Sequence, residues 1–333
     1  MMDQLRVGVV GAGYISTTYH CPSLVKLKSS FESLELAAVC DTDEKRAADA
    51  AGEFGFAAHY TDYGAMLAAE SLDAALVLVP PAVMQEVAAE FIRRKLPVLL
   101  EKPPAGSGQG VRELIAERRK AGKPAVVALN RRFMPLARQA REIVDRMAAR
   151  DRPANACTAR MLRHKRTEQE FALGTGVHSI DLLRYLLGDV ASVSTNKWQA
   201  DGNEAPSYLV DFEFRNGARA NLAILPESGL EAERYTVHGP GWCLMLDAPL
   251  EWTIDYPGRL SLYEGRERHS VQDNAVWPPV FRDNLRITGF LGENEHFLNC
   301  VLGKEIPSPA LEDCLQSIEI GECVQSGGKA EFN

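Results

Sequence analysis

The sequence lacks three features that would assign it quickly to a class of protein. No apolar run approaches the roughly 20 residues needed to cross a bilayer, so we expect no membrane span. Basic residues are not in excess: 37 Lys and Arg against 45 Asp and Glu give a net charge of -8, which argues against nucleic acid or an anionic membrane as partner. The N-terminus has no basic segment and cleavage site of a secretory leader, and we therefore expect a cytoplasmic protein.

Cysteine patterns that mark disulfide frameworks or zinc sites are also missing. The 7 cysteines are scattered, none forms a C-x-x-C pair, and no Cys/His cluster has zinc spacing. We expect reduced, mostly buried thiols and no metal site. What the chain does have is length: 333 residues exceed one typical core, which predicts two domains.

Apolar strands alternate with helix-like stretches through residues 1–125. The expected strands cover 5–10, 34–40, 74–79, 97–100 and 125–129, and the expected helices cover 14–28, 43–54, 83–95 and 110–121. Thr42 or Asp43 is a plausible cap of the second helix. Alternation at this spacing predicts an α/β Rossmann domain, a parallel doubly wound sheet, over residues 1–125.

The pattern changes after Asn130. A helix is expected from about 136 to 150, and strands at 207–214 and 218–224 are joined by an Asn216-Gly217 hairpin turn. Further strands are expected at 235–237 and 260–263, and helices at 293–302 and 311–323. Residues 126–333 therefore read as an α+β domain with a mainly antiparallel sheet.

A glycine-rich turn follows the first strand and is the first sign of a ligand. Gly11 suits a tight turn, Gly13 removes a side chain where backbone approaches a pyrophosphate, and Ser16 is small enough for close helix packing. Asp41 ends the second strand, where an acid accepts hydrogen bonds from ribose hydroxyls. A carboxylate there disfavours a 2′-phosphate, so NAD is favoured over NADP, although Arg46 lies one helical turn on. A role for Asp41 as a helix cap only stays open.

Lys102 follows the fourth expected strand, at the sheet edge where ligands bind in this class of fold. A lysine held there beside a nicotinamide cation would have its pKa lowered toward a useful range for proton transfer. Position alone fits a solvated strand-end lysine equally well.

Motifs in order along the chain make the sequence resemble a known family across essentially its whole length, the glucose–fructose oxidoreductase, inositol dehydrogenase and MocA family. The motifs are Gly11 to Ser16, Val79-Pro80-Pro81, Glu101-Lys102-Pro103, Asn130 to Phe133, Gly176 to Asp181, Glu295 to Leu298 and Pro307 to Asp313. The resemblance implies a Rossmann domain and a C-terminal open-faced sheet that packs against another subunit in a homodimer or homotetramer. It also implies hydride transfer between a nicotinamide and a hydroxyl-bearing carbon of a sugar or polyol substrate.

The same resemblance implies roles for individual residues. Lys102 would polarise or deprotonate the substrate hydroxyl, and His178 would be its acid/base partner. The implied cofactor-binding residues are Gly11, Gly13, Tyr14, Ile15, Asp41, Val79, Pro80, Pro81, Glu101, Lys102 and Asn130. A histidine before an apolar helix also fits a cap or a core residue, so this alternative stays open for His178. For Asp181 we expect a structural, hydrogen-bonding role.

Three positions depart from the family pattern. Gly174 stands where an Asp four residues before the histidine is usual, Val79 replaces a Thr, and Met84 replaces a His. The missing acid leaves open a catalytically impaired NAD(H)-binding sensor or regulatory protein, and a second alternative is an enzyme that cycles a tightly bound cofactor. A basic cluster precedes the Gly174 region and reads as a solvated loop or as the border of a pocket for phosphate or carboxylate. Its members are Arg160, Arg163, His164, Lys165 and Arg166.

Overall fold

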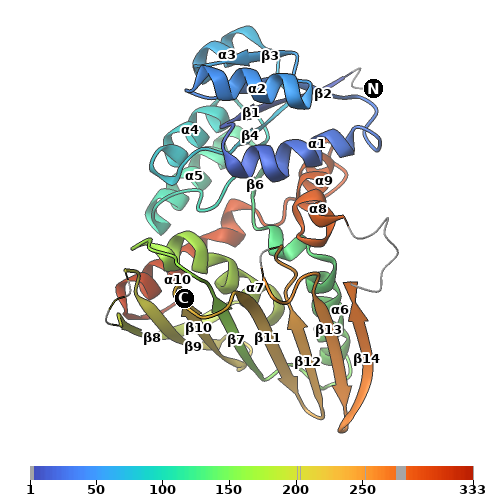
Figure 1. Ribbon diagram of the computed structural model, residues 1–333, viewed down its shortest axis with the longest axis vertical. Helices are drawn as coiled ribbons and strands as arrows, with labels where there is room; N and C mark the ends of the chain where they lie inside the picture. The colour runs from blue at the N-terminus through green and yellow to red at the C-terminus, as the bar shows by residue number, and fades with distance from the viewer. Residues whose placement is uncertain (1–3, 201, 203, 252, 275–282, 333) are drawn as a thin grey trace. The chain divides into compact units, whose positions relative to one another are not determined.

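The computed structural model describes residues 4–200, 202, 204–251, 253–274 and 283–332 (Figure 1). Contacts divide the chain into two compact units. Met1–Leu129 and Phe290–Leu315 form the first unit, and Asn130–Gly289 and Gln316–Asn333 form the second. Within the described residues, no helix has the length and apolar character that crossing a membrane requires.

The first unit is built on a six-stranded parallel sheet in the order β3-β2-β1-β4-β5-β6. Its strands are β1 (Leu5–Val10), β2 (Leu34–Cys40), β3 (Ala58–Tyr60), β4 (Ala74–Val77), β5 (Val98–Leu100) and β6 (Ala125–Val127). Its helices are the π-helical turn η1 (Ser16–His20), α1 (Cys21–Leu27), α2 (Glu44–Phe54), α3 (Tyr63–Ala69), α4 (Pro81–Arg93), α5 (Gly108–Ala121) and α9 (Phe290–Val301). This confirms the predicted doubly wound sheet.

Local sequence explains why these elements begin and end where they do. All residues of β4, β5 and β6 are buried, as expected for strands covered on both faces. Asp43 caps α2 by accepting a hydrogen bond from the Arg46 backbone N–H, and Gly55 ends that helix in the left-handed conformation. Ser107 and Gly122 play the same two roles for α5. β3 and α3 are additions to the sequence-based prediction.

The second unit is built on a nine-stranded sheet in the order β14-β13-β12-β11-β7-β10-β9-β8-β15. Its strands are β7 (Ala156–Leu162), β8 (Val190–Trp198), β9 (Ser207–Phe214), β10 (Arg219–Leu225), β11 (Ala232–Gly239), β12 (Trp242–Asp247), β13 (Arg259–Glu264), β14 (Glu267–Asp273) and β15 (Lys329–Glu331). β7 runs parallel to β10, and the other neighbours among the described strands are antiparallel. This confirms the predicted α+β domain with a mainly antiparallel sheet.

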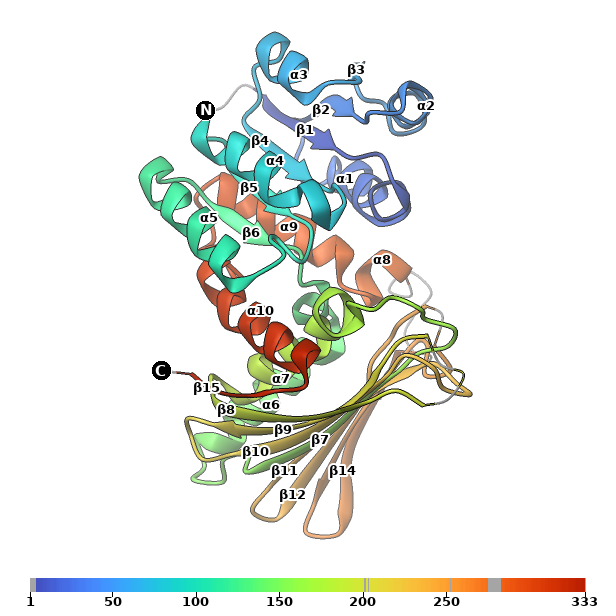
Figure 2. The same cartoon turned by 90° about the vertical axis from the view of Figure 1, so that its left-hand side faces the viewer.

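The helices of the second unit lie on one face of that sheet (Figure 2). The helical elements are η2 (Asn130–Phe133), α6 (Pro135–Ala148), η3 (Ala172–Gly176), α7 (Val177–Leu187), α8 (Asn284–Ile287) and α10 (Leu311–Ser326), which begins in the first unit. Burial alternates along the strands, so that Tyr208, Val210, Phe212 and Phe214 of β9 face the core. The opposite face of the sheet carries the exposed residues.

Residues 290–315 fall in the first unit, whereas the sequence analysis places them in the second domain. Helix α9 packs on the segment that follows the glycine turn: the ring centroids of Phe290 and His20 are 5.5 Å apart. Val127, the last residue of β6, donates its backbone N–H to the Pro309 carbonyl at 2.9 Å. These contacts join residues far apart in the chain, and a reading along the sequence carries no signal for them.

Candidate cofactor and catalytic site

The carboxyl ends of β1, β4 and β5 meet at one edge of the parallel sheet. The ladder continues past the strands, because Leu78 N–H donates to the Val10 carbonyl at 2.7 Å and Glu101 N–H donates to the Val77 carbonyl at 3.0 Å. β1 lies between β2 and β4. The strands after β1 are added first on one side, as β2 and β3, and then on the other side, as β4 to β6, so the order of the strands reverses at β1. Ligands bind at such a switch point in doubly wound folds. The segments after these strands, beginning at Gly11, Leu78 and Glu101, therefore share this edge.

The two glycines of the turn differ in what requires them. Gly11 has a φ of +97°, and a Cβ atom there would lie 2.3 Å from the Leu78 carbonyl oxygen, so the protein itself demands glycine. Gly13 has no such constraint: a Cβ there would meet no atom of the described residues within 4 Å. The space above Gly13 is open, which fits close approach of a pyrophosphate to the backbone. The residues present at this turn therefore fit NAD.

Asp41 follows β2 directly and faces the glycine turn. Its Oδ2 accepts from the Ala12 N–H at 2.8 Å, and its Oδ1 accepts from the Asp43 N–H at 2.9 Å. A carboxylate oxygen has a second lone pair, so both oxygens can also accept from ribose hydroxyls. Since Asp43 is the cap of α2, Asp41 is not the helix cap that the sequence left open. Arg46 is exposed and paired with Asp43, with 3.6 Å between Nε and Oδ2.

The segment after Gly13 is helical from Tyr14, as predicted, and widens into the π-turn η1 before α1. Ser16, the third small residue of the motif, is buried, and its Oγ lies 3.4 Å from Cys21 Sγ. Tyr14 is exposed and meets the ring of Tyr19 edge-on, with the centroids 6.0 Å apart. Ile15, which lies between Tyr14 and Ser16 in the sequence, is half-buried.

Lys102 stands at the end of β5, as predicted. Its backbone N–H donates to Glu101 Oε2 at 2.5 Å, both residues are half-buried, and the Lys102–Pro103 peptide is cis. On the neighbouring segment, Val79 is half-buried, and Pro80 and Pro81 are exposed at the start of α4.

Met84, one of the departures from the family pattern, is buried in the first unit with 1% of its surface exposed. It fills core space on the inner side of α4. An ionisable side chain at that depth would need a polar partner.

Asn130 belongs to the second unit, where its side chain is buried. Its Nδ2 donates to the Thr288 carbonyl at 2.9 Å, and its Oδ1 accepts from Arg131 Nη1 at 3.0 Å. The side chain is therefore held in one orientation, with the amide oxygen turned toward an arginine.

His178 is the second residue of α7 and is 7% exposed. Helix α7 continues directly from η3, with Gly176 at its cap position, so His178 is not a helix cap. The next residue, Ser179, accepts a hydrogen bond from the Tyr235 hydroxyl at 2.8 Å. This bond anchors the first turn of α7 to β11.

Gly174 lies four residues before His178, in the π-helical turn η3. Residues at this spacing share one helical face. A Cβ at Gly174 would meet nothing within 4 Å among the described residues, and its φ is not in the left-handed region. The position could thus hold the side chain that family members usually carry there.

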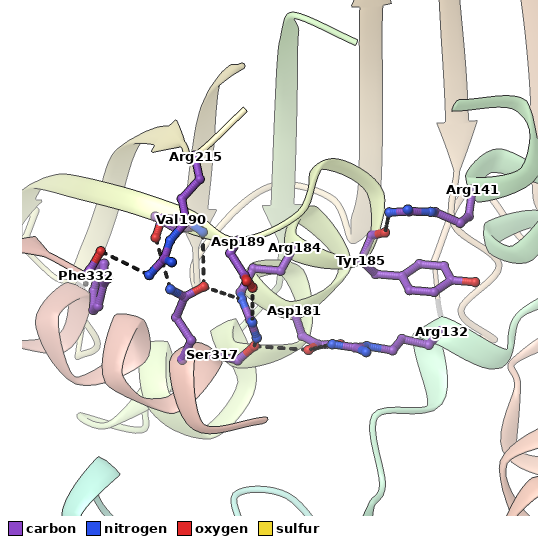
Figure 3. A network of polar contacts seen from close by, with 11 residues as sticks. Arg132, Arg141, Asp181, Arg184, Tyr185, Asp189, Val190, Arg215, Ser317 and Phe332 are labelled. Atoms are coloured by element: carbon purple, nitrogen blue, oxygen red, sulfur yellow. Dashed lines mark hydrogen bonds and ion pairs between the residues drawn. The ribbon is translucent and has the colours of Figure 1, made fainter. Parts of the chain in front are cut away.

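Asp181 is the centre of a buried polar network in the second unit (Figure 3). Arg132 Nε and Nη2 both donate to its carboxylate at 2.7 Å, and Ser317 Oγ donates to it at 3.0 Å. Arg184 Nη1 in turn donates to Ser317 at 2.8 Å. The network ties α7 to η2 and α10, which is the structural role expected for Asp181.

A second buried cluster, which we call the Arg131–Glu233–Arg163 cluster, escaped the sequence analysis in part. Glu233 is fully buried and accepts from Arg131 Nη2 at 2.8 Å and Nε at 3.1 Å, and also from Arg163 Nη2. Burial by itself would raise the pKa of Glu233, but the two guanidiniums outweigh it and lower the pKa to about 2. Glu233 precedes the expected strand 235–237 by two residues and shares the inward period of Tyr235 and Val237, which was the one available signal.

The five basic residues between positions 160 and 166 differ in their burial. Arg163 is buried, whereas Arg160, His164 and Lys165 are exposed. Arg166 is half-buried and paired with Glu168. No three His, Cys, Asp or Glu side chains within the described part of the chain are grouped to hold a metal ion.

The fold and the glycine turn define an oxidoreductase with a nicotinamide-binding Rossmann domain, and sequence comparison gives the family. Residues 5–129 match the model of the oxidoreductase family with an NAD-binding Rossmann fold, and residues 163–327 match that family's C-terminal alpha/beta domain. The chain belongs to this family, the glucose–fructose oxidoreductase, inositol dehydrogenase and MocA family, and NAD is its cofactor.

Individual relatives agree with this assignment. The chain is 26% identical to inositol 2-dehydrogenase 2 of Saccharopolyspora erythraea over 335 aligned positions, 95% of this chain and 94% of the relative. A dehydrogenase from Chromobacterium violaceum has the same fold, with a TM-score of 0.86 at 20% identity over 98% of this chain and 96% of that one. Levoglucosan dehydrogenase, solved with NADH and L-sorbose, superposes with a TM-score of 0.83 at 17% identity over 100% of both chains.

Proposed function

We propose that this oxidoreductase transfers a hydride between NAD and a hydroxyl-bearing carbon of a sugar or polyol, with Lys102 and His178 as acid/base groups. The observation that carries the proposal is the shared sheet edge, where the open glycine turn follows β1, Asp41 follows β2 and the Glu101–Lys102 pair follows β5 of the same parallel sheet. The substrate class is supported by the names of the relatives, which are dehydrogenases of inositol and levoglucosan.

Each cofactor-binding residue has a proposed task. NAD, when bound, supplies the hydride acceptor. The backbone at Gly11 and Gly13 receives its pyrophosphate, and Asp41 accepts hydrogen bonds from its adenosine ribose. The further residues proposed to line the cofactor are Tyr14, Ile15, Val79, Pro80, Pro81, Glu101, Lys102 and Asn130.

Oxidation of an alcohol requires a base as well as a hydride acceptor. As the carbon gives up its hydride and the C–O bond becomes a carbonyl, the hydroxyl proton passes to the Lys102 amine. The Glu101 carboxylate holds the backbone N–H of Lys102, which fixes the start of the lysine residue at the end of β5. His178 is the second group able to hold that proton, and it does so without the carboxylate that would occupy position 174 in relatives.

Replacement of Lys102 tests the mechanism directly. We expect Lys102→Ala to lower kcat by about 10²- to 10⁴-fold, the usual size of a general acid–base contribution, on any sugar or polyol that the wild type oxidises. NADH binding, followed by fluorescence, should persist. Lys123→Ala, an exposed lysine before β6, is the matched control and should leave kcat unchanged. Unchanged turnover in Lys102→Ala would contradict the proposal.

A second candidate function is that of an NAD(H)-binding sensor or regulatory protein with little turnover, and Gly174 favours it. Position 174 is open, so Gly174→Asp should fold normally and place a carboxylate one turn before His178. If the protein is a sensor, the wild type binds NADH without oxidising a broad panel of sugars and polyols, and Gly174→Asp gains activity. Ready turnover by the wild type would exclude the sensor.

We also propose that the exposed face of the nine-stranded sheet packs against a second copy of the chain in a homodimer or homotetramer. Large apolar side chains stand on it among charges: Leu209, Met245 and Val271 are 38%, 43% and 40% exposed. Arg234, Asp247, Arg259 and Asp273 follow one another across β11 to β14 as alternating charges, which suits an antiparallel copy of the same row. Light scattering should report an oligomer, and Met245→Glu should dissociate it.

A further inference from the structure

Helix α7 carries His178 in its first turn, and two other residues on the same side of this helix contact Arg132. His178, Asp181 and Tyr185 stand at positions i, i+3 and i+7, the spacing of neighbours along one face of a helix. Arg132 Nε and Nη2 each donate to a carboxylate oxygen of Asp181 at 2.7 Å, and Arg132 Cζ lies 5.6 Å from the centroid of the Tyr185 ring (Figure 3). One arginine thus contacts the histidine's face of α7 at two points about one turn apart.

The contact between Arg132 and Asp181 is of a kind that fixes orientation. Asp181 is 1% exposed and the Arg132 side chain is 11% exposed, so both groups are largely shielded from water. Two parallel N–H···O bonds between a guanidinium and a carboxylate hold the two groups in a defined geometry, which the ammonium of a lysine, a point charge on a flexible stem, cannot reproduce. Arg132 therefore fixes the direction of the Asp181 side chain and, with it, the rotation of α7 about its axis.

A second anchor holds the other side of the same turn. Ser179 accepts from the Tyr235 hydroxyl of β11 at 2.8 Å, and both side chains are buried. Successive residues of an α-helix are about 100° apart around its axis, so Ser179 and Asp181 lie about 200° apart, on nearly opposite sides. The turn that carries His178 is therefore fixed from one side by β11 and from the other by Arg132.

The groups that bind Asp181 come from the two segments where the chain enters the second unit. That unit begins at Asn130 and resumes at Gln316. Arg132 lies two residues after the first of these points. Ser317, which donates to Asp181 Oδ1 at 3.0 Å, lies one residue after the second. Asp181 thus ties the helix of the histidine to both entry segments.

A small rotation of α7 is enough to affect proton transfer. An atom at the surface of a helix lies about 5–6 Å from the axis, so a rotation of about 10° moves it by about 1 Å. A misplacement of about 1 Å can lower the rate of a catalysed step by about 10²-fold. An acid/base group must also lie within hydrogen-bond reach of the proton that it takes or gives. The rotation of α7 therefore sets how well His178 can act.

We propose that Arg132 is a positioning residue for the reaction, which fixes the rotation of α7 through Asp181 and Tyr185 and so holds the His178 imidazole in place for proton transfer. This inference rests on the proposed function, in which His178 is an acid/base group. Because Arg132 acts through the histidine, its replacement should have little effect on turnover once the histidine is gone.

A double-mutant cycle tests this dependence. Wild type, Arg132→Lys, His178→Gln and the double variant are assayed with NAD on myo-inositol, levoglucosan and D-glucose. Arg141→Lys is the matched control, because Arg141 donates to the Tyr185 carbonyl at 2.5 Å and so contacts α7 seven residues after His178. Arg132→Lys keeps a positive charge beside Asp181 and should fold, which thermal unfolding checks.

Arg132→Lys should lower kcat by about 10- to 100-fold and leave KM and the NADH dissociation constant within about twofold of wild type. In the His178→Gln background the same substitution should change kcat by less than about twofold, because interacting residues are non-additive. Ser317→Ala removes one hydrogen bond to Asp181 and no charge, and it should give a smaller loss of kcat with the same dependence on His178. Arg141→Lys should leave kcat unchanged.

A spectroscopic readout applies whether or not turnover is found. When the ring carbons of the 7 histidines are labelled with ¹³C, the NMR signal that His178→Gln removes reports on the surroundings of that imidazole. Arg132→Lys should shift or broaden this signal, and Arg141→Lys should leave it in place.

The results separate the inference from the proposed function. An equal loss of kcat from Arg132→Lys in both backgrounds, or a His178 signal that Arg132→Lys does not change, overturns the inference. A His178→Gln protein with wild-type kcat, or a wild type that oxidises none of the three compounds, counts against the proposed function instead. In that case the His178 signal alone decides whether Arg132 positions the imidazole.

Discussion

Substitution of Gly11 by alanine should destabilise the first unit strongly, although it adds a single methyl group. The backbone at Gly11 is left-handed with φ +97°, which costs an L-residue about 1–2 kcal/mol. The new Cβ would also lie 2.3 Å from the Leu78 carbonyl oxygen, a backbone atom that cannot rotate away. Relieving that overlap should cost about 1–3 kcal/mol more, as in other overpacked sites. The expected loss of about 2–5 kcal/mol is a large part of a typical domain stability of 5–15 kcal/mol.

Gly13→Ala is the matched variant, because it adds the same methyl group two residues away where no described atom lies within 4 Å. It should unfold within about 0.5 kcal/mol of wild type, as substitutions free of contacts usually do. It should nevertheless bind NADH at least tenfold more weakly, since the methyl group occupies space needed by the pyrophosphate.

Urea unfolding followed by circular dichroism gives the stabilities, and fluorescence titration gives the NADH dissociation constants. The two glycines should separate cleanly: Gly11→Ala loses stability, and Gly13→Ala loses affinity. A Gly11→Ala protein as stable as wild type would refute the steric reasoning. A Gly13→Ala protein with wild-type affinity would refute the assignment of the turn to the pyrophosphate.

Two further predictions concern buried charge. Burial lowers the pKa of His20 from 6.5 to about 4, although a hydrogen bond with Asn294 acts in the opposite direction. Between pH 6.5 and 4 the unfolded chain therefore binds a proton that the folded chain does not. The free energy of unfolding should fall by about 3 kcal/mol as the pH drops through this range. Unfolding across that range should show a shallower pH dependence in His20→Asn, and identical slopes would contradict the assignment. Asp181→Asn removes the buried carboxylate that accepts from Arg132 and should cost about 3–5 kcal/mol. Asp49→Asn breaks an exposed pair with Lys45 and should change the thermal unfolding far less.

The Rossmann part of the fold could be predicted because each of its signals is local. Strands such as 74–79 are continuous apolar runs, the glycine turn follows a strand directly, and caps such as Asp43 stand at helix ends. β3 and α3 were missed for the same reason. A strand of 3 residues with a partly exposed pattern is too short to show a period.

The second unit was harder, because its strands have one polar face. β9 and β10 were found through their alternation and the Asn216-Gly217 turn between them. β7 escaped, since Thr158 and Arg160 point outward and interrupt the apolar residues of a strand that lies at the centre of the sheet. Its parallel pairing with β10 joins residues 63 positions apart, such as Ala156 and Arg219, and no local turn in the sequence indicates it.

The candidate site shows the same limit at the level of single residues. Gly11, Asp41 and Lys102 could be chosen because a strand end marks each position. Arg131 and Glu233 form a buried ion pair although they are 102 residues apart in the chain, and no sequence motif contains both of them.

The burial of Arg163 could not be predicted from the sequence without the fold. In the sequence it is one of five basic residues within seven positions, and such a run is usually a solvated loop. Side chains alternate between the two faces of the sheet along β7 and just after it. Arg160 therefore points to the exposed face, and Arg163 points to the covered face, where it donates to Glu233 of the neighbouring strand β11. Strand alternation thus divides one cationic segment into an exposed charge and a buried one.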